Sequence, residues 1–361
     1  MPEILIAAMP PVGHIGPLLN VARGLVDRGD RVTVLSSADH AARIRAIGAT
    51  PQAIPAEADF DMTRLDIDLP GRAETSGIKR LNLDIVRLFV QPMPHQTTVL
   101  SQLMAQTKFD AIIVDAGFFG ILPFLLGDRA ARPPVLAYST TPLMVTSRDT
   151  APSGMGLRPS STALGRLRNR ALNLLSQRVL LRQSQNTANY VLDHMNSRQL
   201  PMFILDSGLL ADRYISPTVP EFDYPRGDLP AHVRYVGAVH PTSAGGFRLP
   251  PWRAELDGDR PVVHVTQGTI DNADLGRLVE PTIEALGGED VIVVATTGGR
   301  DMSELKMRLP MNTFVAEYIP HDLLLPKVDV MVTNGGYGAV QRALSTGVPL
   351  VVAGNTEDKP E

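Results

Sequence analysis

One histidine stands in a segment whose other residues are mostly glycine, proline and small apolar side chains. Residues 9–17 read MPPVGHIGP and directly follow the apolar run ILIAA. Proline has no N–H to donate to a strand ladder and glycine weakens a strand, so we expect a tight loop that ends a strand. Histidine titrates near neutral pH and is a common general base. His14 is therefore a candidate base, with a purely structural role as the alternative.

A base of this kind needs a carboxylate that fixes its tautomer and stabilises the imidazolium. Asp115 ends the apolar segment FDAIIVDA, which we expect to be a buried strand. Ligands of open parallel sheets bind outside the carboxyl ends of the strands, so His14 and Asp115 should share that edge. Asp110 competes for the role, but it precedes the same strand and should lie at the opposite edge. We therefore expect Asp115 to be the partner.

Two glycine-containing loops are candidates for a phosphate site. VTNGGYGAV reads as strand, glycine turn and helix, and a helix N-terminus offers N–H groups and a positive dipole end to an anion. VTQGTI ends a neighbouring strand and would bring Gly268 and the Thr269 hydroxyl to the same place. Neither a G-x-G-x-x-G pattern nor a P-loop lysine motif accompanies these loops. The glycines that would let a ligand approach the backbone are Gly335, Gly336 and Gly338.

The sequence contains no strong metal-binding pattern. The chain has no cysteine, which excludes disulfides, thiolate metal sites and a cysteine nucleophile. Two D-x-D strings, Asp66/Asp68 and Asp257/Asp259, could in principle hold a divalent ion. They stand in an irregular acidic segment and in a linker, so we expect solvated loops and no metal.

Composition sets broad limits on the function. The 361 residues carry a formal net charge of −4, which does not favour nucleic acid as a partner. The N-terminus lacks the basic segment of a signal peptide. No apolar stretch approaches the roughly 20 residues that span a bilayer. We expect a cytoplasmic protein.

Apolar strands alternate with amphipathic helices at both ends of the chain. Strands are expected at EILIAA, RVTVLSS, FDAIIVDA and PPVLAYST. The first helix is expected at PLLNVARGLVDRG, with Pro17 in its first turn and Gly29 at its C-terminal cap. The alternation restarts after 260. This pattern predicts an α/β protein of two doubly wound domains facing a cleft: 1–239, a linker 240–260, and 261–361. No helix follows the last strand, so we expect the second domain to be incomplete at its C-terminal end.

The segment GRLRNRALNLLSQRVLLRQ, residues 165–183, predicts a basic helix with five arginines and no acid. It would be a solvated helix if Leu167, Leu174 and Leu181 pack inward. The alternative is a contact between 165–183 and a membrane surface or an acidic partner.

Together these motifs resemble the inverting GT-B glycosyltransferases that use nucleotide sugars, the UDP-glycosyltransferase type found in macrolide, glycopeptide and plant secondary metabolism. GHIGPLLNVARGLVDRGDRVTVLSS is similar to the family's opening pattern, with Asp30 where histidine is usual. EYIPHDLLLPKVDVMVTNGGYGAVQRALSTGVPLVVAGNTEDKPE is similar to its donor-binding signature. The resemblance covers nearly the whole chain and implies two Rossmann-like domains, an acceptor domain followed by a donor domain.

The resemblance implies a role for each matching residue. His14 would deprotonate the acceptor hydroxyl, and Asp115 would orient it. Tyr318 would replace the tryptophan that stacks on the base, the Ile319 backbone would contact the base edge, and His321 would lie near the ribose. The remaining donor positions are Gly268, Thr269, Asn334, Gly335, Gly336, Gly338, Ala339, Asp358 and Lys359, with Asp358 on the sugar hydroxyls.

Three departures from the family pattern concern the donor. Asn334 stands where a histidine usually binds the diphosphate, and Ala339 replaces a hydroxyl side chain. Arg342 stands where a glutamate usually accepts from the ribose hydroxyls, and a guanidinium only donates. A dTDP-sugar, with its deoxyribose, is thus an alternative to a UDP-sugar.

The expected reaction is transfer of a hexose to a hydroxyl of a small apolar acceptor such as a polyketide, flavonoid or lipid, with inversion and without a metal or other cofactor. A nucleotide-sugar epimerase and a non-catalytic nucleotide-sugar-binding or auxiliary protein are the alternatives. The irregular regions 60–100 and 145–235 are expected to shape the acceptor pocket. Its candidate wall residues, which ordinary core packing would explain equally well, are Phe89, Met93, Phe118, Phe119, Leu143 and Met144.

Overall fold

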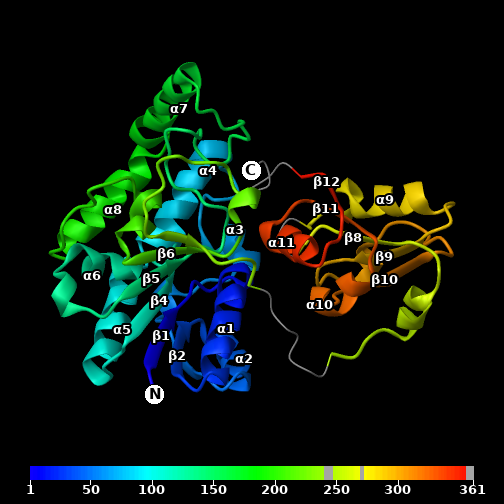
Figure 1. Cartoon of the computed structure of the whole chain (residues 1–361), viewed down its shortest axis with the longest axis horizontal. Coiled ribbons are helices and arrows are strands. Elements are labelled where there is room, and N and C mark those ends of the chain that lie inside the picture. Colours follow the sequence, from blue (N-terminus) through cyan, green and yellow to red (C-terminus); the bar gives the residue numbers. More distant parts are fainter. Residues whose placement is uncertain (240–246, 269–271, 355–361) are drawn as a thin grey trace. The chain divides into compact units, whose positions relative to one another are not determined.

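The computed structural model of the chain describes residues 1–239, 247–268 and 272–354 (Figure 1). The chain divides into two compact units, Met1–Val239 and His240–Glu361. Each unit has its own parallel sheet with helices, so the predicted α/β class with two doubly wound sheets is confirmed.

The sheet of the first unit has the strand order β3-β2-β1-β4-β5-β6-β7, and each neighbouring pair is parallel. The four predicted strands form its centre. The three further strands were not predicted because their sequences, TPQA, RYIS and VRY, are short and lack an apolar run. The strands are β1 (Glu3–Ala7), β2 (Arg31–Ser36), β3 (Thr50–Ala53), β4 (Ala111–Asp115), β5 (Val135–Tyr138), β6 (Arg213–Ser216) and β7 (Val233–Tyr235).

Strand β1 shows why its sequence is continuously apolar. Leu5 and Ala7 pack into one core cluster, and Ile4 and Ile6 pack into a second one. Successive side chains of a strand point to opposite faces, so both faces of this sheet are buried.

The helices of the first unit are α1 (Val12–Asp27), α2 (Ala41–Ala46), α3 (Leu65–Asp68), α4 (Gly77–Asp84), α5 (Met93–Gln106), α6 (Leu122–Leu126), α7 (Ala163–Leu175) and α8 (Arg182–His194). Two π-helical segments, η4 (Ile85–Val90) and η7 (Ser176–Leu180), continue α4 and α7.

The second unit has the strand order β10-β9-β8-β11-β12, again parallel throughout. The predicted restart of the strand and helix alternation after residue 260 is confirmed. The elements are β8 (Val262–Thr266), α9 (Val279–Leu286), β9 (Ile292–Thr296), β10 (Thr313–Ala316), α10 (His321–Leu324), β11 (Val330–Thr333), α11 (Tyr337–Ser345) and β12 (Leu350–Val352).

The start of α1 differs from the prediction. The helix begins at Val12, with Pro11 as its N-cap, so Pro17 lies inside the helix and His14 lies in its first turn rather than in a loop. Pro17 lacks the N–H that would donate to the Gly13 carbonyl, and its ring crowds that carbonyl, which is why the first turn is the expected place for it. Gly29 follows the helix end with φ +94°, as predicted for its C-terminal glycine.

The segment 165–183 is helical, but it is not one helix: α7 ends at Leu175, η7 at Leu180, and α8 begins at Arg182 after Leu181. Its packing also differs from the prediction. Leu181 is buried, whereas Leu167 and Leu174 are 64% and 45% exposed. Among the described residues, no helix combines the length and apolar character needed to cross a bilayer.

Candidate active site

His14 and Asp115 meet at the carboxyl edge of the first sheet. The distance between His14 Nδ1 and Asp115 Oδ2 is 2.7 Å. His14 follows β1, Asp115 ends the adjacent strand β4, and the Asp115 carboxylate is almost fully buried. Asp110 lies at the other end of β4, where its carboxylate accepts from the Glu3 N–H at 2.8 Å. The sheet therefore brings together the pair that the sequence singled out and keeps its competitor apart.

The contacts of Asp115 define how the histidine ring is held. The second oxygen, Oδ1, accepts from the Gly117 N–H at 2.9 Å. An ionised carboxylate only accepts hydrogen bonds, so Nδ1 of a neutral His14 carries the proton and points it at Asp115. The unprotonated nitrogen is then Nε2, which is the state that a general base requires.

Thr140 is a third member of this site that sequence reasoning missed. Its hydroxyl oxygen lies 3.0 Å from His14 Nδ1. Thr140 follows β5, the neighbour of β4, and the rule that selected Asp115 from the strand ends could also have found it.

The six apolar residues proposed as acceptor contacts divide into two groups. Phe89 is half-buried, with its ring centroid 6.4 Å from that of His14, and Met144 is exposed. The other four are at most 4% exposed and belong to packed core clusters, so the structure places them in the core rather than on an open surface: Met93, Phe118, Phe119 and Leu143.

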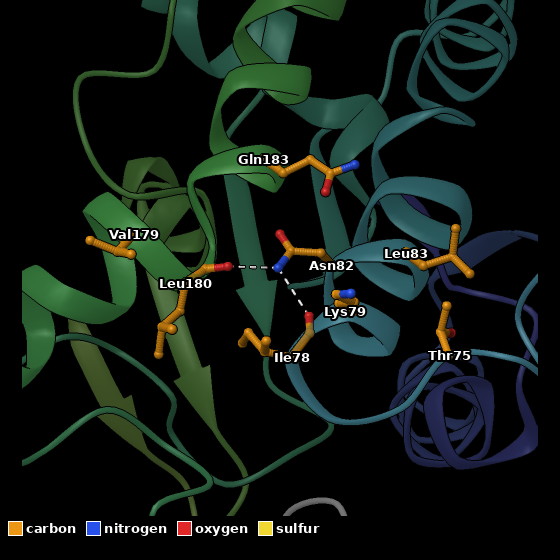
Figure 2. A pocket seen from close by; sticks show the side chains of 8 residues that line it. All are labelled: Thr75, Ile78, Lys79, Asn82, Leu83, Val179, Leu180 and Gln183. Carbon is orange, nitrogen blue, oxygen red and sulfur yellow. Dashed lines mark hydrogen bonds between the residues drawn. The ribbon is translucent and has the colours of Figure 1, made fainter.

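A cavity of about 450 Å³ opens between α4 and the η7–α8 segment (Figure 2). Asn82 joins its two walls, because its Nδ2 donates to the Ile78 carbonyl at 3.0 Å and to the Leu180 carbonyl at 2.7 Å. The walls come from both irregular regions expected to shape an acceptor pocket, although none of these residues was predicted individually. The cavity is lined by Thr75, Ile78, Lys79, Asn82, Leu83, Val179, Leu180 and Gln183.

The glycine loops of the second unit lie after the adjacent strands β8 and β11. Gly268 and Gly335 have φ values of +71° and +87°, a conformation that favours glycine. Asn334 is buried, and its Nδ2 donates to the Gln267 carbonyl at 2.6 Å, which ties the two loops together.

The start of α11 refines the expected phosphate turn. Gly336 is the N-cap of α11, whereas Gly338 and Ala339 lie in its first helical turn. The Ala339 N–H donates to the Gly336 carbonyl at 3.0 Å. Thr269, Asp358 and Lys359 lie outside the described residues.

Asn272 and Gly298 contact the loop that holds Gly268. Asn272 Nδ2 donates to the carbonyls of Gly268 and Thr297, each at 3.0 Å. Gly298 has φ +70°, and a Cβ there would lie 1.9 Å from the Gly268 carbonyl oxygen. Only glycine allows this close approach.

A cluster of polar side chains lies beside these loops in the second unit. Tyr318 is 51% exposed, and burial lowers the pKa of Arg342. The His321 ring meets the His264 ring edge-on, with centroids 5.6 Å apart. Ile319 is buried in the core, so its side chain cannot be the contact surface.

The two histidines of this cluster are held neutral. Burial lowers the pKa of His264 to about 4. Burial, together with the nearby His264 and Arg342, lowers the pKa of His321 to about 3. His264 is fully buried, and its Nδ1 faces the Val294 carbonyl at 2.9 Å. It was missed because a histidine inside an apolar strand carries no pattern of its own.

We expect the second unit to lose stability as the pH falls from 6.5 to about 4. Unfolded chains bind a proton at His264 below its ordinary pKa of 6.5, whereas the folded unit resists protonation until about pH 4, so stability rises with pH in this window. Trp252, the single tryptophan, packs on Phe314 in this unit and can report its urea unfolding.

His264→Gln is expected to flatten that pH dependence, and His95→Gln, at an exposed position in the first unit, is the control. If the free energy of unfolding changed with pH in the same way in the wild type and in His264→Gln, His264 would not be the group that resists protonation in the folded unit.

The acidic pairs considered as metal ligands are engaged with basic side chains. Asp66 forms ion pairs with Arg72 and Arg80, and Asp257 pairs with Lys327. Within the described ranges, no three His, Asp or Glu side chains are grouped so that they could hold a metal ion.

Comparison with known proteins identifies relatives along the whole chain. The chain is 40% identical over 361 residues to the 4'-demethylrebeccamycin synthase of Lentzea aerocolonigenes, covering 99% of this chain and 84% of that protein. It is 33% identical to the UDP-glycosyltransferase 2 of Phaeomoniella chlamydospora, covering 100% and 82%. No family model matches the chain.

Solved structures support the fold independently. The crystal structure of the glycotransferase of kitacinnamycin superposes with a TM-score of 0.72 at 22% identity, covering 100% of this chain and 82% of that one.

Proposed function

Since the chain belongs to the GT-B glycosyltransferases of the UDP-glycosyltransferase type, which use nucleotide-sugar donors, we propose that it moves a hexose to a hydroxyl of a small apolar acceptor with inversion of the anomeric centre. The chain is an enzyme of this family, and the proposal concerns its chemistry and its substrates. The observation that carries it is the 2.7 Å contact between His14 and Asp115.

In the proposed reaction, His14 Nε2 takes the proton of the acceptor hydroxyl as its oxygen attacks the anomeric carbon. As the new bond to the acceptor oxygen forms, the bond from that carbon to the diphosphate oxygen breaks. The nucleoside diphosphate leaves with that electron pair, and the sugar is now attached to the acceptor with inverted configuration. Asp115 keeps the proton of Nδ1 in place and stabilises the imidazolium that forms. The negative charge of the buried Asp115 carboxylate thereby stabilises the positive charge of the imidazolium, which exists only during the reaction.

The proposed donor site uses the glycine loops after β8 and β11. The positive end of α11 and the backbone N–H groups of Gly336 and Gly338 would face the diphosphate and stabilise its developing charge, so no metal is required. Tyr318 is exposed and available for stacking on the nucleobase. Asn334 already donates to Gln267, which favours a role in shaping the loops for this side chain.

Arg342 bears on the choice of nucleotide. A guanidinium only donates hydrogen bonds and accepts none. A ribose 2′-hydroxyl would therefore lack the hydrogen-bond acceptor that a glutamate provides. The deoxyribose of a dTDP-sugar has no 2′-hydroxyl, so it loses no hydrogen bond at this position. We propose that the enzyme accepts dTDP-sugars as well as UDP-sugars.

The proposed acceptor is an apolar secondary metabolite of the polyketide, flavonoid or lipid kind. A relative is named for the synthesis of 4'-demethylrebeccamycin, and the aromatic ring of Phe89 lies beside His14. A flat apolar acceptor could pack on Phe89 while presenting its hydroxyl to the base.

A mass-spectrometric screen tests this function. UDP- and dTDP-glucose and dTDP-rhamnose are each crossed with aromatic polyketide, flavonoid and hydroxylated lipid acceptors, with and without EDTA. We expect an acceptor mass increased by one hexose, unchanged by EDTA, and an NMR coupling constant that reports inversion. Donor binding without product from any pair, or retention of configuration, would contradict the proposal.

A further inference from the structure

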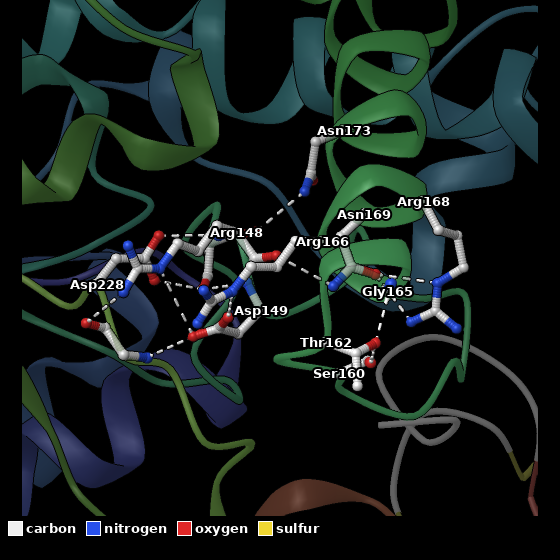
Figure 3. A network of polar contacts seen from close by, with 12 residues as sticks. Arg148, Asp149, Ser160, Thr162, Gly165, Arg166, Arg168, Asn169, Asn173 and Asp228 are labelled. Atoms are coloured by element: carbon white, nitrogen blue, oxygen red, sulfur yellow. Dashed lines mark hydrogen bonds and ion pairs between the residues drawn. The ribbon is translucent and has the colours of Figure 1, made fainter.

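Helix α7 packs against its own unit through polar side chains (Figure 3). Asn169 and Asn173 are buried. Asn169 Nδ2 donates to the Arg148 carbonyl at 3.2 Å, and Asn173 Nδ2 donates to the carbonyls of Ser147 and Thr150 at 3.2 and 3.1 Å. The inward face of this helix is therefore hydrogen-bonded to the 147–150 segment rather than packed into an apolar core.

An ion pair fixes the same orientation. Arg166 Nε lies 2.7 Å from Asp149 Oδ1, and Asp149 Oδ2 accepts from the Gly227 N–H at 2.8 Å. Turning the leucines of α7 inward would break these contacts and leave buried polar groups without partners. The orientation of the helix is thus determined by its polar face.

The opposite side of α7 and η7 is an exposed apolar surface, here called the α7 apolar face. Large aliphatic side chains on a surface helix of a globular protein are normally turned toward the core, but the ones on this face are highly exposed. The face consists of Leu164 (80% exposed), Leu167 (64%), Leu174 (45%), Leu175 (45%) and Val179 (63%).

Exposed arginines accompany the α7 apolar face. They are Arg168, Arg170, Arg178 and Arg182. The sequence has no acidic residue between Asp149 and Asp193, and no ion pair among the described residues engages these four arginines. The whole chain has a net charge of −4, so this positive region is local and would orient the molecule toward an anionic surface.

We propose that the α7 apolar face docks on a membrane surface rich in anionic lipids, with α7 lying in the plane of the interface. Leucines would enter the boundary between headgroups and acyl chains, and the flanking arginines would reach the lipid phosphates. A second copy of the chain is the less favourable occupant, because a symmetric contact through this face would bring the same arginines together without acids. Val179 also lines the cavity of Figure 2, so docking would place that cavity beside the lipid.

Vesicle sedimentation of the whole chain tests this proposal. We expect the wild type to sediment with phosphatidylcholine vesicles that contain phosphatidylglycerol, to bind pure phosphatidylcholine weakly, and to be released by salt. Replacing Leu164, Leu167 and Leu175 by glutamine should weaken binding at least about tenfold. Replacing Arg170, Arg178 and Arg182 by glutamine should weaken it comparably and remove the salt dependence.

The control variant changes Ile67 and Met311 to glutamine, two exposed apolar side chains outside the α7 apolar face, and should bind like the wild type. Because all the replaced side chains are exposed, circular dichroism should be unchanged. Absence of wild-type binding to anionic vesicles would overturn the proposal. So would binding by both triple variants that equals wild-type binding, or light scattering that shows a dimer lost in the leucine variant without any vesicle binding.

Discussion

Replacing His14 by alanine is expected to lower kcat by about 10³-fold while the Kd for the nucleoside diphosphate stays unchanged. The reason is that His14 belongs to the first unit and is proposed to act only on the acceptor proton, whereas the proposed donor contacts belong to the second unit. Product formation is measured by mass spectrometry with saturating donor, and nucleotide binding is measured by calorimetry.

His194→Ala is the matched control, since His194 is an exposed histidine on α8 and its Nδ1 contacts only the Tyr190 carbonyl among the bonds described. It should transfer sugar like the wild type. A His14→Ala variant that transfers sugar at the wild-type rate would show that another group takes the proton.

Replacing Asp115 by asparagine is expected to reduce kcat by roughly 10³-fold without unfolding the chain. The amide has the shape of the carboxylate, but its NH₂ can donate to His14 Nδ1. That bond would hold the proton on Nε2, the nitrogen that must accept the acceptor proton, and the imidazolium would lose its negative partner. The loss should appear in kcat rather than in donor binding.

Asp110→Asn is the control for this variant, because it makes the same change at the opposite end of the same strand. Asp110 accepts only from the Glu3 N–H among the hydrogen bonds described for it, so its variant should keep full activity. If the two variants lost activity equally, the effect would come from β4 as a whole and not from the orientation of His14.

Residues near a strand's carboxyl end were the most predictable part of the site. Asp115 and the glycine loops at 268 and 335 were found because parallel strands collect their carboxyl ends at one edge. That rule does not say which side chains will be covered. Phe118 follows a strand end, as the rule requires, yet it is fully buried. Met93, from the irregular region that also holds the half-buried Phe89, is fully buried too. Burial depends on what packs above a side chain, which a local pattern does not contain.

In helix α7, too, the local sequence pattern does not determine which side chains are buried. Its 3.6-residue pattern defines two faces, and hydrophobicity alone predicts that the leucines face inward. The asparagines face inward instead, because the carbonyls of residues 147–150 are there to receive their hydrogen bonds. The sequence specified the two faces, and only the partner segment decided which one is buried.

The sequence by itself determined the two parallel sheets, the family and the pairing of His14 with Asp115. These features follow from periodicity, from strand ends and from motifs a few residues long, which local physics decides. The tertiary structure alone decided that α1 begins at Val12, that Thr140 joins the histidine, and that His264 is buried against His321. The contacts of Thr140 and His264 join segments far apart in the chain, so their formation depends on how the whole sheet packs.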